Sequence, residues 1–381
     1  MLPFSNESDD MQNDNARACA PLGIPARLDR RRFLARTAAL SASGLWGHGA
    51  MASDDDGRNR AQEVLGAALS VDMHSHVGGS SLRKQVDDFP GIADAGLSAV
   101  CLSLVSDSPV LGQAGGRLFM RREPLPDELY HHMLERLDFA DRAIESHRLR
   151  RIHGLADLQS AKQSGVAGII LSTEGGDFLD GKLERLETLR QRGVRHFQLV
   201  HYRQGNGIGD IQTEMPVAHG ATPFGLDVVR ACNRLGIVVD VAHATIEAVR
   251  QVVKVADQPL VLSHTAHVTR PKAWSRHIDT EHARLVRDTG GVVGVWTNAS
   301  DFPDAASFAT GVAKMAEVVG AEHVGIGTDL NGLVHPLLKS YADFPGLVAA
   351  LFKHFNDDEV RGIVGGNYLR VFDRVTAGKP A

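Results

Sequence analysis

The stretch Val71-Asp72-Met73-His74-Ser75-His76 is an apolar run that ends in two histidines one residue apart. In an extended backbone, side chains at positions i and i+2 leave on the same face, so both imidazoles can reach one ion where the strand ends. Such a pair is half of a metal site. An isolated His-x-His is also found where polar residues simply end a strand, so the rest of the chain must decide between the two interpretations.

Seven further apolar runs rich in β-branched residues follow this one, and helical patterns lie between them. The eight candidate strands cover residues 69–74, 99–104, 167–173, 196–201, 237–243, 260–264, 292–297 and 324–329. Their near-continuous hydrophobicity, without alternation, is typical of parallel strands covered on both faces. The helical patterns include residues 183–192, 225–235, 245–255, 279–289 and 305–319. We therefore predict a (β/α)8 TIM barrel, with a doubly wound sheet as the alternative.

A long insertion separates the second and third predicted strands. It contains a predicted loop over residues 106–126 and an amphipathic helix over residues 127–147. A loop of that length after a barrel strand is expected to lie over the barrel mouth, where it can shape a pocket. We interpret its charged pairs, Arg121-Arg122 and His131-His132, as a solvated surface.

The predicted strand ends carry an unusual set of polar side chains. Active groups of this fold gather at the carboxyl ends of the strands. The residues found there are His74, His76, Glu174, His201, His243, His264, Asn298 and Asp329. Buried imidazoles and carboxylates need partners, so this distribution argues against simple core packing.

Neutral imidazoles and carboxylates suit zinc and similar divalent ions. Four histidines and one glutamate exceed the needs of one tetrahedral site, whereas a pair of ions bridged by a carboxylate fits the number. We expect His74 and His76 on one ion, His243 and His264 on the other, and Glu174 between them. Such sites hold a hydroxide whose parent water has its pKa lowered from about 15.7 toward about 7, which makes it the expected nucleophile.

Several segments together resemble one known family. They are Thr173-Glu174-Gly175-Gly176, Leu199-Val200-His201, Val239-Asp240-Val241-Ala242-His243, Leu262-Ser263-His264 and Val324-Gly325-Ile326-Gly327-Thr328-Asp329-Leu330-Asn331-Gly332. The set is similar to the membrane (renal) dipeptidase family, a branch of the amidohydrolase superfamily, over about residues 65–372. The resemblance implies a dinuclear zinc barrel that hydrolyses dipeptides, with Glu174 as the bridging carboxylate.

The resemblance also implies roles for individual residues. His243 and His264 match the ligands of the second ion, and His201 matches the histidine that stabilises the tetrahedral oxyanion. Asp329 matches the carboxylate that takes a proton from the nucleophile and passes it to the leaving amine. Arg276 corresponds to the arginine that binds the substrate carboxylate, where a planar guanidinium gives a bidentate contact. Because the spacing from His264 differs by one residue from the family pattern, Arg270 or His267 can share this role.

Two departures from the family pattern stand out. The first strand of well-known members ends in His-x-Asp, whereas this chain has His74-Ser75-His76. Histidine still ligates zinc, but a neutral ligand in place of an anion adds one unit of positive charge to the site, which affects metal preference or the pKa of the bridging water. The segment 201–210 also differs from the family sequence, so the substrate pocket is expected to differ.

The N-terminus resembles an export signal. Asp29-Arg30-Arg31-Arg32-Phe33-Leu34-Ala35 is similar to a twin-arginine motif, and an apolar segment follows it up to Ala50-Met51-Ala52, a small-x-small cleavage site. We predict a signal peptide over residues 1–52, a polar linker over 53–62, the barrel domain over 63–381, and a periplasmic location. A basic N-terminal segment that is not a signal is the alternative.

Composition narrows the choice of partners. The formal net charge of -5 argues against nucleic-acid or anionic-membrane surfaces, which need a basic field. No hydrophobic tail follows Phe372, so a C-terminal lipid anchor is not expected, whereas a homodimer stays open. Cys101 and Cys232 are interpreted as buried small hydrophobes.

The predicted function is hydrolysis of dipeptides by an exported dizinc enzyme. Two alternatives remain at this stage: an N-acyl-amino-acid or other amide hydrolase on the same scaffold, and a periplasmic barrel that binds metal or solute without turnover.

Overall fold

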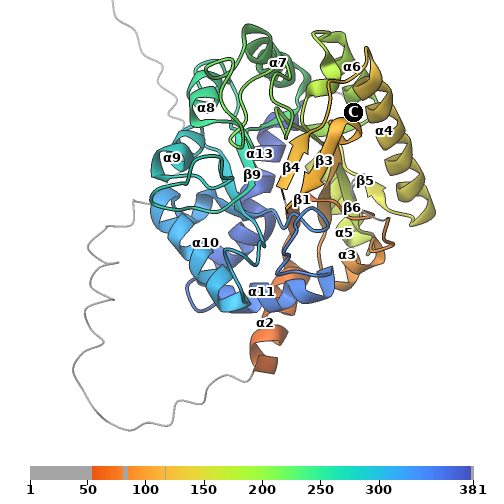
Figure 1. Ribbon diagram of the computed structural model, residues 1–381. Helices are drawn as coiled ribbons and strands as arrows, with labels where there is room; N and C mark the ends of the chain where they lie inside the picture. The colour runs from red at the N-terminus through yellow and green to blue at the C-terminus, as the bar shows by residue number, and fades with distance from the viewer. Residues whose placement is uncertain (1–53, 80–84, 116, 379–381) are drawn as a thin grey trace, which may run out of the picture. The chain divides into compact units, whose positions relative to one another are not determined.

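A parallel sheet forms the centre of the computed structural model, which describes residues 54–79, 85–115 and 117–378. The strand order is β1-β2-β6-β7-β8-β9-β10-β11. Figure 1 shows the strands in the middle of the fold, with β1, β6 and β9 labelled. Their bounds are β1 Val71–Ser75, β2 Ala99–Val105, β6 Gly168–Glu174, β7 Val194–Gln198, β8 Val238–Asp240, β9 Val261–Thr265, β10 Val292–Val295 and β11 Val324–Ile326. The short strand β5 (Arg150–Arg151) also pairs with β6.

The two ends of this sheet meet. A parallel bridge joins Ser75 to Leu330, and the His76 amide donates to the Leu330 carbonyl at 2.9 Å. Each of the eight predicted strands corresponds to one of the eight main strands, although some bounds shift by several residues. The predicted eight-stranded parallel barrel is therefore confirmed in a nearly closed form.

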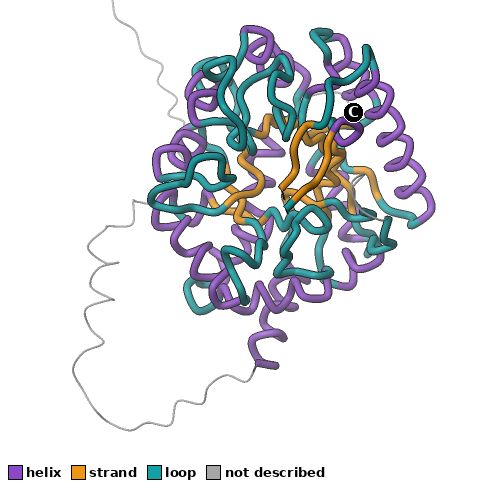
Figure 2. The backbone as a smooth tube through the Cα atoms, in the orientation of Figure 1, coloured by secondary structure: helices purple, strands orange, loops and turns teal. Residues whose placement is uncertain are grey.

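Helices surround the strands (Figure 2). They are α2 Asp54–Ala67, α3 Pro90–Asp94, α4 Glu128–Ser146, α5 Leu155–Gln163, α6 Glu184–Gln191, α7 Pro223–Leu235, α8 Ile246–Val252, α9 Thr280–Asp288, α10 Ala305–Val319, α11 Phe344–Leu351, α12 Asp357–Arg361 and α13 Asn367–Thr376. Helix α7 shows how the sequence sets the ends: the Gly225 amide donates to the Thr222 hydroxyl at the start, and Gly236 adopts a φ of 68° at the end.

The strands divide the core into an outer and an inner layer. On β2, Val100 and Leu102 belong to the apolar cluster that packs under the helices, whereas Cys101 belongs to a second cluster inside the barrel. Helix α13 contributes Tyr368 and Phe372 to this inner cluster. Because that cluster also contains the first residues of several strands, α13 fills the amino-terminal end of the barrel and the carboxyl ends remain available for a site.

The insertion after β2 contains more structure than the sequence indicates. The predicted helix over 127–147 corresponds to α4. The predicted loop over 106–126 instead holds a 3₁₀ turn (Ser108–Val110) and an antiparallel hairpin of β3 (Leu111–Ala114) and β4 (Arg117–Met120). Residues of the hairpin line the cavity over the carboxyl ends of the strands, in agreement with the expected position of the insertion.

The N-terminal boundary differs from the prediction. Residues 54–62, expected to be a polar linker, form the first part of α2, in which Ala61 and Leu65 are fully buried. The predicted signal peptide, residues 1–52, lies outside the described residues.

Among the helices that the structure describes, none combines the length and apolar character needed to cross a bilayer. Within the same part of the chain, Cys101 and Cys232 are free and buried.

Candidate metal centre and active site

A bulge in β1 positions the first histidine. Val71 pairs with Ala99 of β2, but Ser75 pairs with Leu102, so β1 carries one extra residue in this interval. The bulge aims His74 into the barrel, where its Nδ1 lies 2.9 Å from Ser103 Oγ on β2 and 3.5 Å from Ser263 Oγ on β9. His76 follows two residues later and enters the same space.

A second bulge in β9 positions another histidine. Leu262 pairs with Val293 of β10 and Thr265 with Val295, so Ser263 and His264 together oppose Gly294. As a result His264 turns into the barrel, and its ring stacks on that of His74 with centroids 3.8 Å apart.

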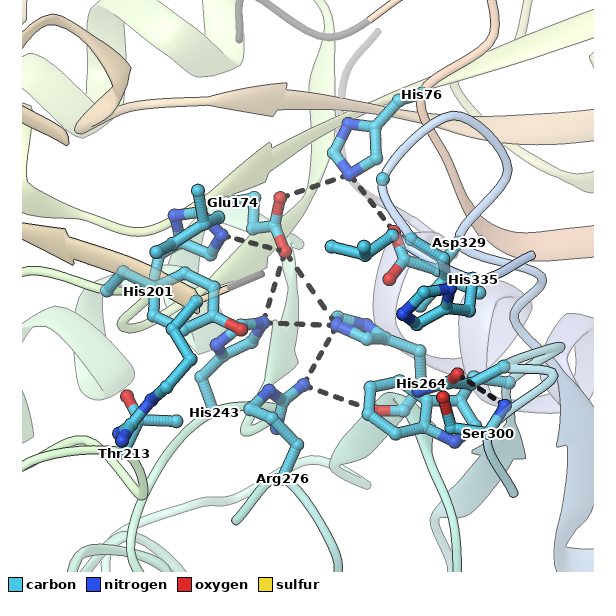
Figure 3. Close-up of a pocket in the computed structure, with 18 of the residues that line it drawn as sticks. His76, Glu174, His201, Thr213, His243, His264, Arg276, Ser300, Asp329 and His335 are labelled. Carbon is cyan, nitrogen blue, oxygen red and sulfur yellow. Dashed lines mark hydrogen bonds and ion pairs between the residues drawn. The ribbon is translucent and has the colours of Figure 1, made fainter. Parts of the chain in front are cut away.

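The side chain of Glu174 lies at the centre of the site (Figure 3). Its Oε2 is 3.2 Å from the Nε2 of His76. Its Oε1 faces the Nε2 atoms of four other histidines, at 3.4 Å for His74, 3.2 Å for His243, 3.4 Å for His201 and 3.7 Å for His264. Asp329 completes the group, with Oδ1 3.4 Å from the Nε2 of His76. The structure thus brings together all five predicted ligands, and each is buried.

These atoms fit a cation better than they fit each other. Among the described residues, His74 Nε2 and Glu174 Oε2 are buried and have no hydrogen-bond partner. Hydrogen-bond partners behind the rings orient two of the histidines: His76 Nδ1 lies 3.1 Å from the Ser103 carbonyl, and His264 Nδ1 lies 2.9 Å from Ser263 Oγ. This arrangement leaves the Nε2 atoms directed at the shared space, as in metal sites whose ligands are oriented by their neighbours.

The charge states of His243, His264 and Glu174 suit a divalent ion, whereas a cation must displace a proton at His76: burial opposes protonation of this ring, but Glu174 and Asp329 raise its pKa to about 10. Burial, with Arg276 nearby, lowers the pKa of His243 well below its ordinary value. Burial and the neighbouring His74 do the same to the pKa of His264. Burial raises the pKa of Glu174, but the adjacent imidazoles outweigh burial and hold it well below its ordinary value. Neutral imidazoles and an ionised carboxylate are the forms that bind metal.

Two of the site residues have an unusual backbone conformation. His243 has a φ of 68° and Asp329 a φ of 54°, in the left-handed region that non-glycine residues seldom adopt. Such conformations persist where the surrounding structure enforces them, and they cluster at functional sites.

The sequence profile named "Membrane dipeptidase (Peptidase family M19)" matches residues 60–380. The chain belongs to this family. Among curated dipeptidases, it is 26% identical over 254 residues to "Dipeptidase tcpJ" of Claviceps purpurea, which covers 63% of this chain and 59% of that protein. The chain therefore spans about three fifths of the length of this relative.

Solved structures of low sequence identity share the fold. The "probable dipeptidase PvdM" from Pseudomonas aeruginosa superposes with a TM-score of 0.71 at 19% identity, over 84% of this chain and 99% of the other. A second structure, titled "amidohydrolase" and also from Pseudomonas aeruginosa, gives a TM-score of 0.68 at 20% identity, over 83% and 98% of the two chains. Both comparisons support the barrel assignment made from the strand pairing.

Sequence reasoning missed one residue of this site that the structure reveals. Asp107 is fully buried, and its Oδ1 lies 2.7 Å from the Nδ1 of His201. Its other oxygen accepts from the amides of Tyr202 and Arg203. Burial opposes protonation of His201, but Asp107 and Glu174 raise its pKa overall. Asp107 follows β2 by two residues, so the rule that located the other strand-end groups could have found it.

Arg276, which we predict to bind the substrate carboxylate, lines a cavity of about 360 Å³ beside the metal ligands. Its Nη1 donates to Gln212 Oε1 at 2.7 Å, and its Nη2 donates to His264 Nε2 at 2.9 Å. Arg270 and His267, the alternatives for carboxylate binding, are not among the described residues that line this cavity. The rest of its wall includes Gln113, Arg117, Leu118, Trp274, Trp296 and Asn298.

Proposed function

We propose that the protein is a metallo-dipeptidase that holds two divalent cations, zinc in the first place, and hydrolyses the peptide bond of short peptides. One observation carries the proposal: the two oxygens of Glu174 face different histidines, Oε2 facing His76 and Oε1 facing His243 and His264, with His74 also on the Oε1 side. Family membership supports it, as do the names of curated relatives such as "Dipeptidase tcpJ".

The donor set fits two cations. The potential ligand atoms form three buried clusters that share members: His74 with His76 and Asp329, His74 with Glu174 and His264, and Glu174 with His201 and His243. When bound, the ions would supply an activated water at neutral pH and polarise the scissile carbonyl.

The residues of the chain itself would handle the protons and the developing charge. Asp329 lies at the edge of the cavity, where its carboxylate can accept a proton from the attacking water and return it to the leaving amine. His201 faces the same space, and Asp107 fixes the orientation of its ring from behind. A proton on His201 Nε2 would be donated to the oxyanion as it forms.

Arg276 would bind the substrate carboxylate. Its guanidinium is buried and directed at the metal ligands, and its present contacts are neutral groups, Gln212 and His264. A carboxylate is a stronger partner for a guanidinium than either group, because both donors and acceptors are then charged.

The proposal is tested by comparing L-Ala-L-Ala with N-acetyl-L-Ala-L-Ala as substrates of the zinc-loaded protein. We expect hydrolysis of the free dipeptide, loss of that activity in Glu174→Gln, and little reaction with the acetylated compound. Preference for the acetylated compound would replace the proposal with an N-acyl-amino-acid hydrolase. Inactivity of the zinc-loaded wild type across a panel of dipeptides would remove catalysis altogether.

We also propose that the protein is exported to the periplasm. The support is the twin-arginine-like segment Arg30-Arg31-Arg32-Phe33-Leu34. Replacing Arg30 and Arg31 together by lysine is expected to keep the full-length protein in the cytoplasmic fraction, whereas the unaltered protein should reach the periplasm in shortened form. Equal distribution of both forms would contradict export by this route.

A further inference from the structure

A buried carboxylate on β1 fixes two strand ends at once. Asp72 is fully buried, and its Oδ1 accepts from the amide of His74, two residues ahead, at 3.2 Å. The same oxygen accepts from the amide of Thr328 at 2.9 Å, and Thr328 directly precedes Asp329. Its Oδ2 accepts from the Thr328 hydroxyl at 2.5 Å and from the Tyr341 hydroxyl at 2.8 Å. Asp72 therefore holds the backbone at His74 and next to Asp329.

A second buried carboxylate repeats this arrangement on β8. Asp240 is fully buried, and its Oδ1 accepts from the amide of Ala242, two residues ahead, at 2.9 Å. The same oxygen accepts from the amide of Ser263 on β9 at 3.0 Å. Ala242 directly precedes His243, and Ser263 directly precedes His264. Asp240 therefore holds the backbone next to both of these histidines.

The two carboxylates are themselves anchored in similar ways. Asp72 contacts the hydroxyl of Tyr341, and Asp240 reaches the hydroxyl of Tyr368 through His196, whose ring nitrogens lie 3.1 Å from Asp240 Oδ2 and 3.0 Å from the Tyr368 oxygen. All of these groups are fully or almost fully buried. A fully hydrogen-bonded buried carboxylate is rigid, because any movement would leave it or its donors without partners.

We propose that Asp72 and Asp240 are positioning residues, each of which sets the ligands of a different metal ion. Asp72 would serve the ion held by His74 and His76, and Asp240 the ion held by His243 and His264. The physical basis is that ligands must be held within about 0.5 Å of the productive geometry, which a hydrogen bond to the adjacent peptide can enforce. Loss of such outer contacts typically costs about 10–100-fold in metal affinity.

The inference predicts a selective loss in each variant. In Asp72→Ala, the affinity for the ion at His74 and His76 should fall by about 10–100-fold while the other ion stays bound. In Asp240→Ala, the pattern should reverse. Two zinc dissociation constants are measured by competition with a chromophoric chelator, and anomalous scattering from crystals grown at limiting zinc shows which site has lost its ion.

Asp210→Ala is the matched control. Its buried side chain likewise accepts backbone amides, those of Val217, Ala218 and Gly220, and in the described part of the chain it makes no hydrogen bond to a proposed metal ligand or to a residue next to one. This variant should lose stability in urea unfolding and keep both zinc affinities. The variants Asp72→Asn and Asp240→Asn retain an acceptor oxygen and should recover most of the affinity lost in the alanine forms.

The outcomes separate this inference from the proposed function on which it rests. Absence of zinc binding in the wild type would refute the metal centre itself. Two ions on the wild type, with unchanged affinities in folded Asp72→Ala and Asp240→Ala, would refute only the positioning roles. Equal weakening of both sites by all three alanine variants would also refute them. If Asp72→Ala does not fold, Tyr341→Phe removes one anchoring hydroxyl and should weaken the same site by several-fold.

Discussion

Replacing Gly294 by alanine should disturb the metal centre through the backbone of its neighbour. A Cβ at this position of β10 would lie 1.8 Å from the Ser263 carbonyl oxygen and 2.7 Å from its carbonyl carbon. Carbon and carbonyl oxygen approach to about 3.3 Å at closest, so the two strands must separate by about 1.5 Å. Because Ser263 directly precedes His264, this ligand must move with them.

The expected size of the effect follows from that clash. Overpacking typically costs about 1–3 kcal/mol, and a contact between two backbones is expected at the upper end, about 3 kcal/mol of unfolding free energy. A shift of about 1.5 Å also exceeds the roughly 0.5 Å that a functional site tolerates, so zinc affinity should fall at least about tenfold. Urea unfolding of the metal-free protein and a zinc competition titration measure the two quantities separately.

The matched control is Gly66→Ala in α2. Among the described residues, nothing lies within 4 Å of a Cβ built there, so the change should stabilise the helix by about 0.5–1 kcal/mol and leave zinc binding unaltered. Wild-type stability and zinc affinity in Gly294→Ala would refute the close packing of Gly294 against the Ser263 carbonyl in the β9 bulge.

Three further predictions concern single side chains. Asp107→Ala should lower kcat by about 10²–10³ with little change in KM, because His201 loses the group that orients its ring; an unchanged kcat would exclude that role. Arg276→Lys should raise KM for dipeptides about tenfold or more, since lysine cannot make the bidentate contact, and an unaltered KM would place the carboxylate elsewhere. Burial lowers the pKa of His282 to about 4 from the 6.5 of an unfolded chain, so the unfolded state binds more protons between these values. Neutral His282 therefore leaves the free energy of unfolding unaffected above pH 6.5 and lowers it by about 3 kcal/mol as the pH drops to 4. Urea unfolding of His282→Gln over the same pH range should show a smaller loss.

The sequence predicts the barrel well because its strands depend on local composition. Runs such as 167–173 are largely apolar and include β-branched residues, and parallel strands buried on both faces need that composition. Once the barrel is assumed, the carboxyl-end rule alone places Glu174 beside His243 and His264. The structure adds the distances, which show that the side chains of these three residues face one common space.

Other features depend on tertiary contacts that no local pattern records. The residues of α2 before Ala61 are almost all polar, and the helix is fixed through a few side chains such as Leu65 that pack into the core. The β3–β4 hairpin includes exposed and half-buried residues without a clear alternation of apolar side chains. The bulges that aim His74 and His264 are defined only by the register of a neighbouring strand.

The departure at position 76 also becomes clearer in the structure. His76 stands where well-known members of the family have an aspartate, and its Nε2 lies 3.2 Å from Glu174 and 3.4 Å from Asp329. Because Glu174 and Asp329 both match residues of the family pattern, they do not compensate for the substitution, and the site still has one unit of negative charge less than it would with an aspartate at position 76.

Anomalous diffraction from zinc-loaded crystals tests most directly whether Glu174 joins two metal sites, as we propose. We predict two zinc peaks per chain, one beside His74 and His76 and one beside His243 and His264, with a carboxylate oxygen of Glu174 on each. A single peak, or two peaks of which one does not contact Glu174, would contradict it.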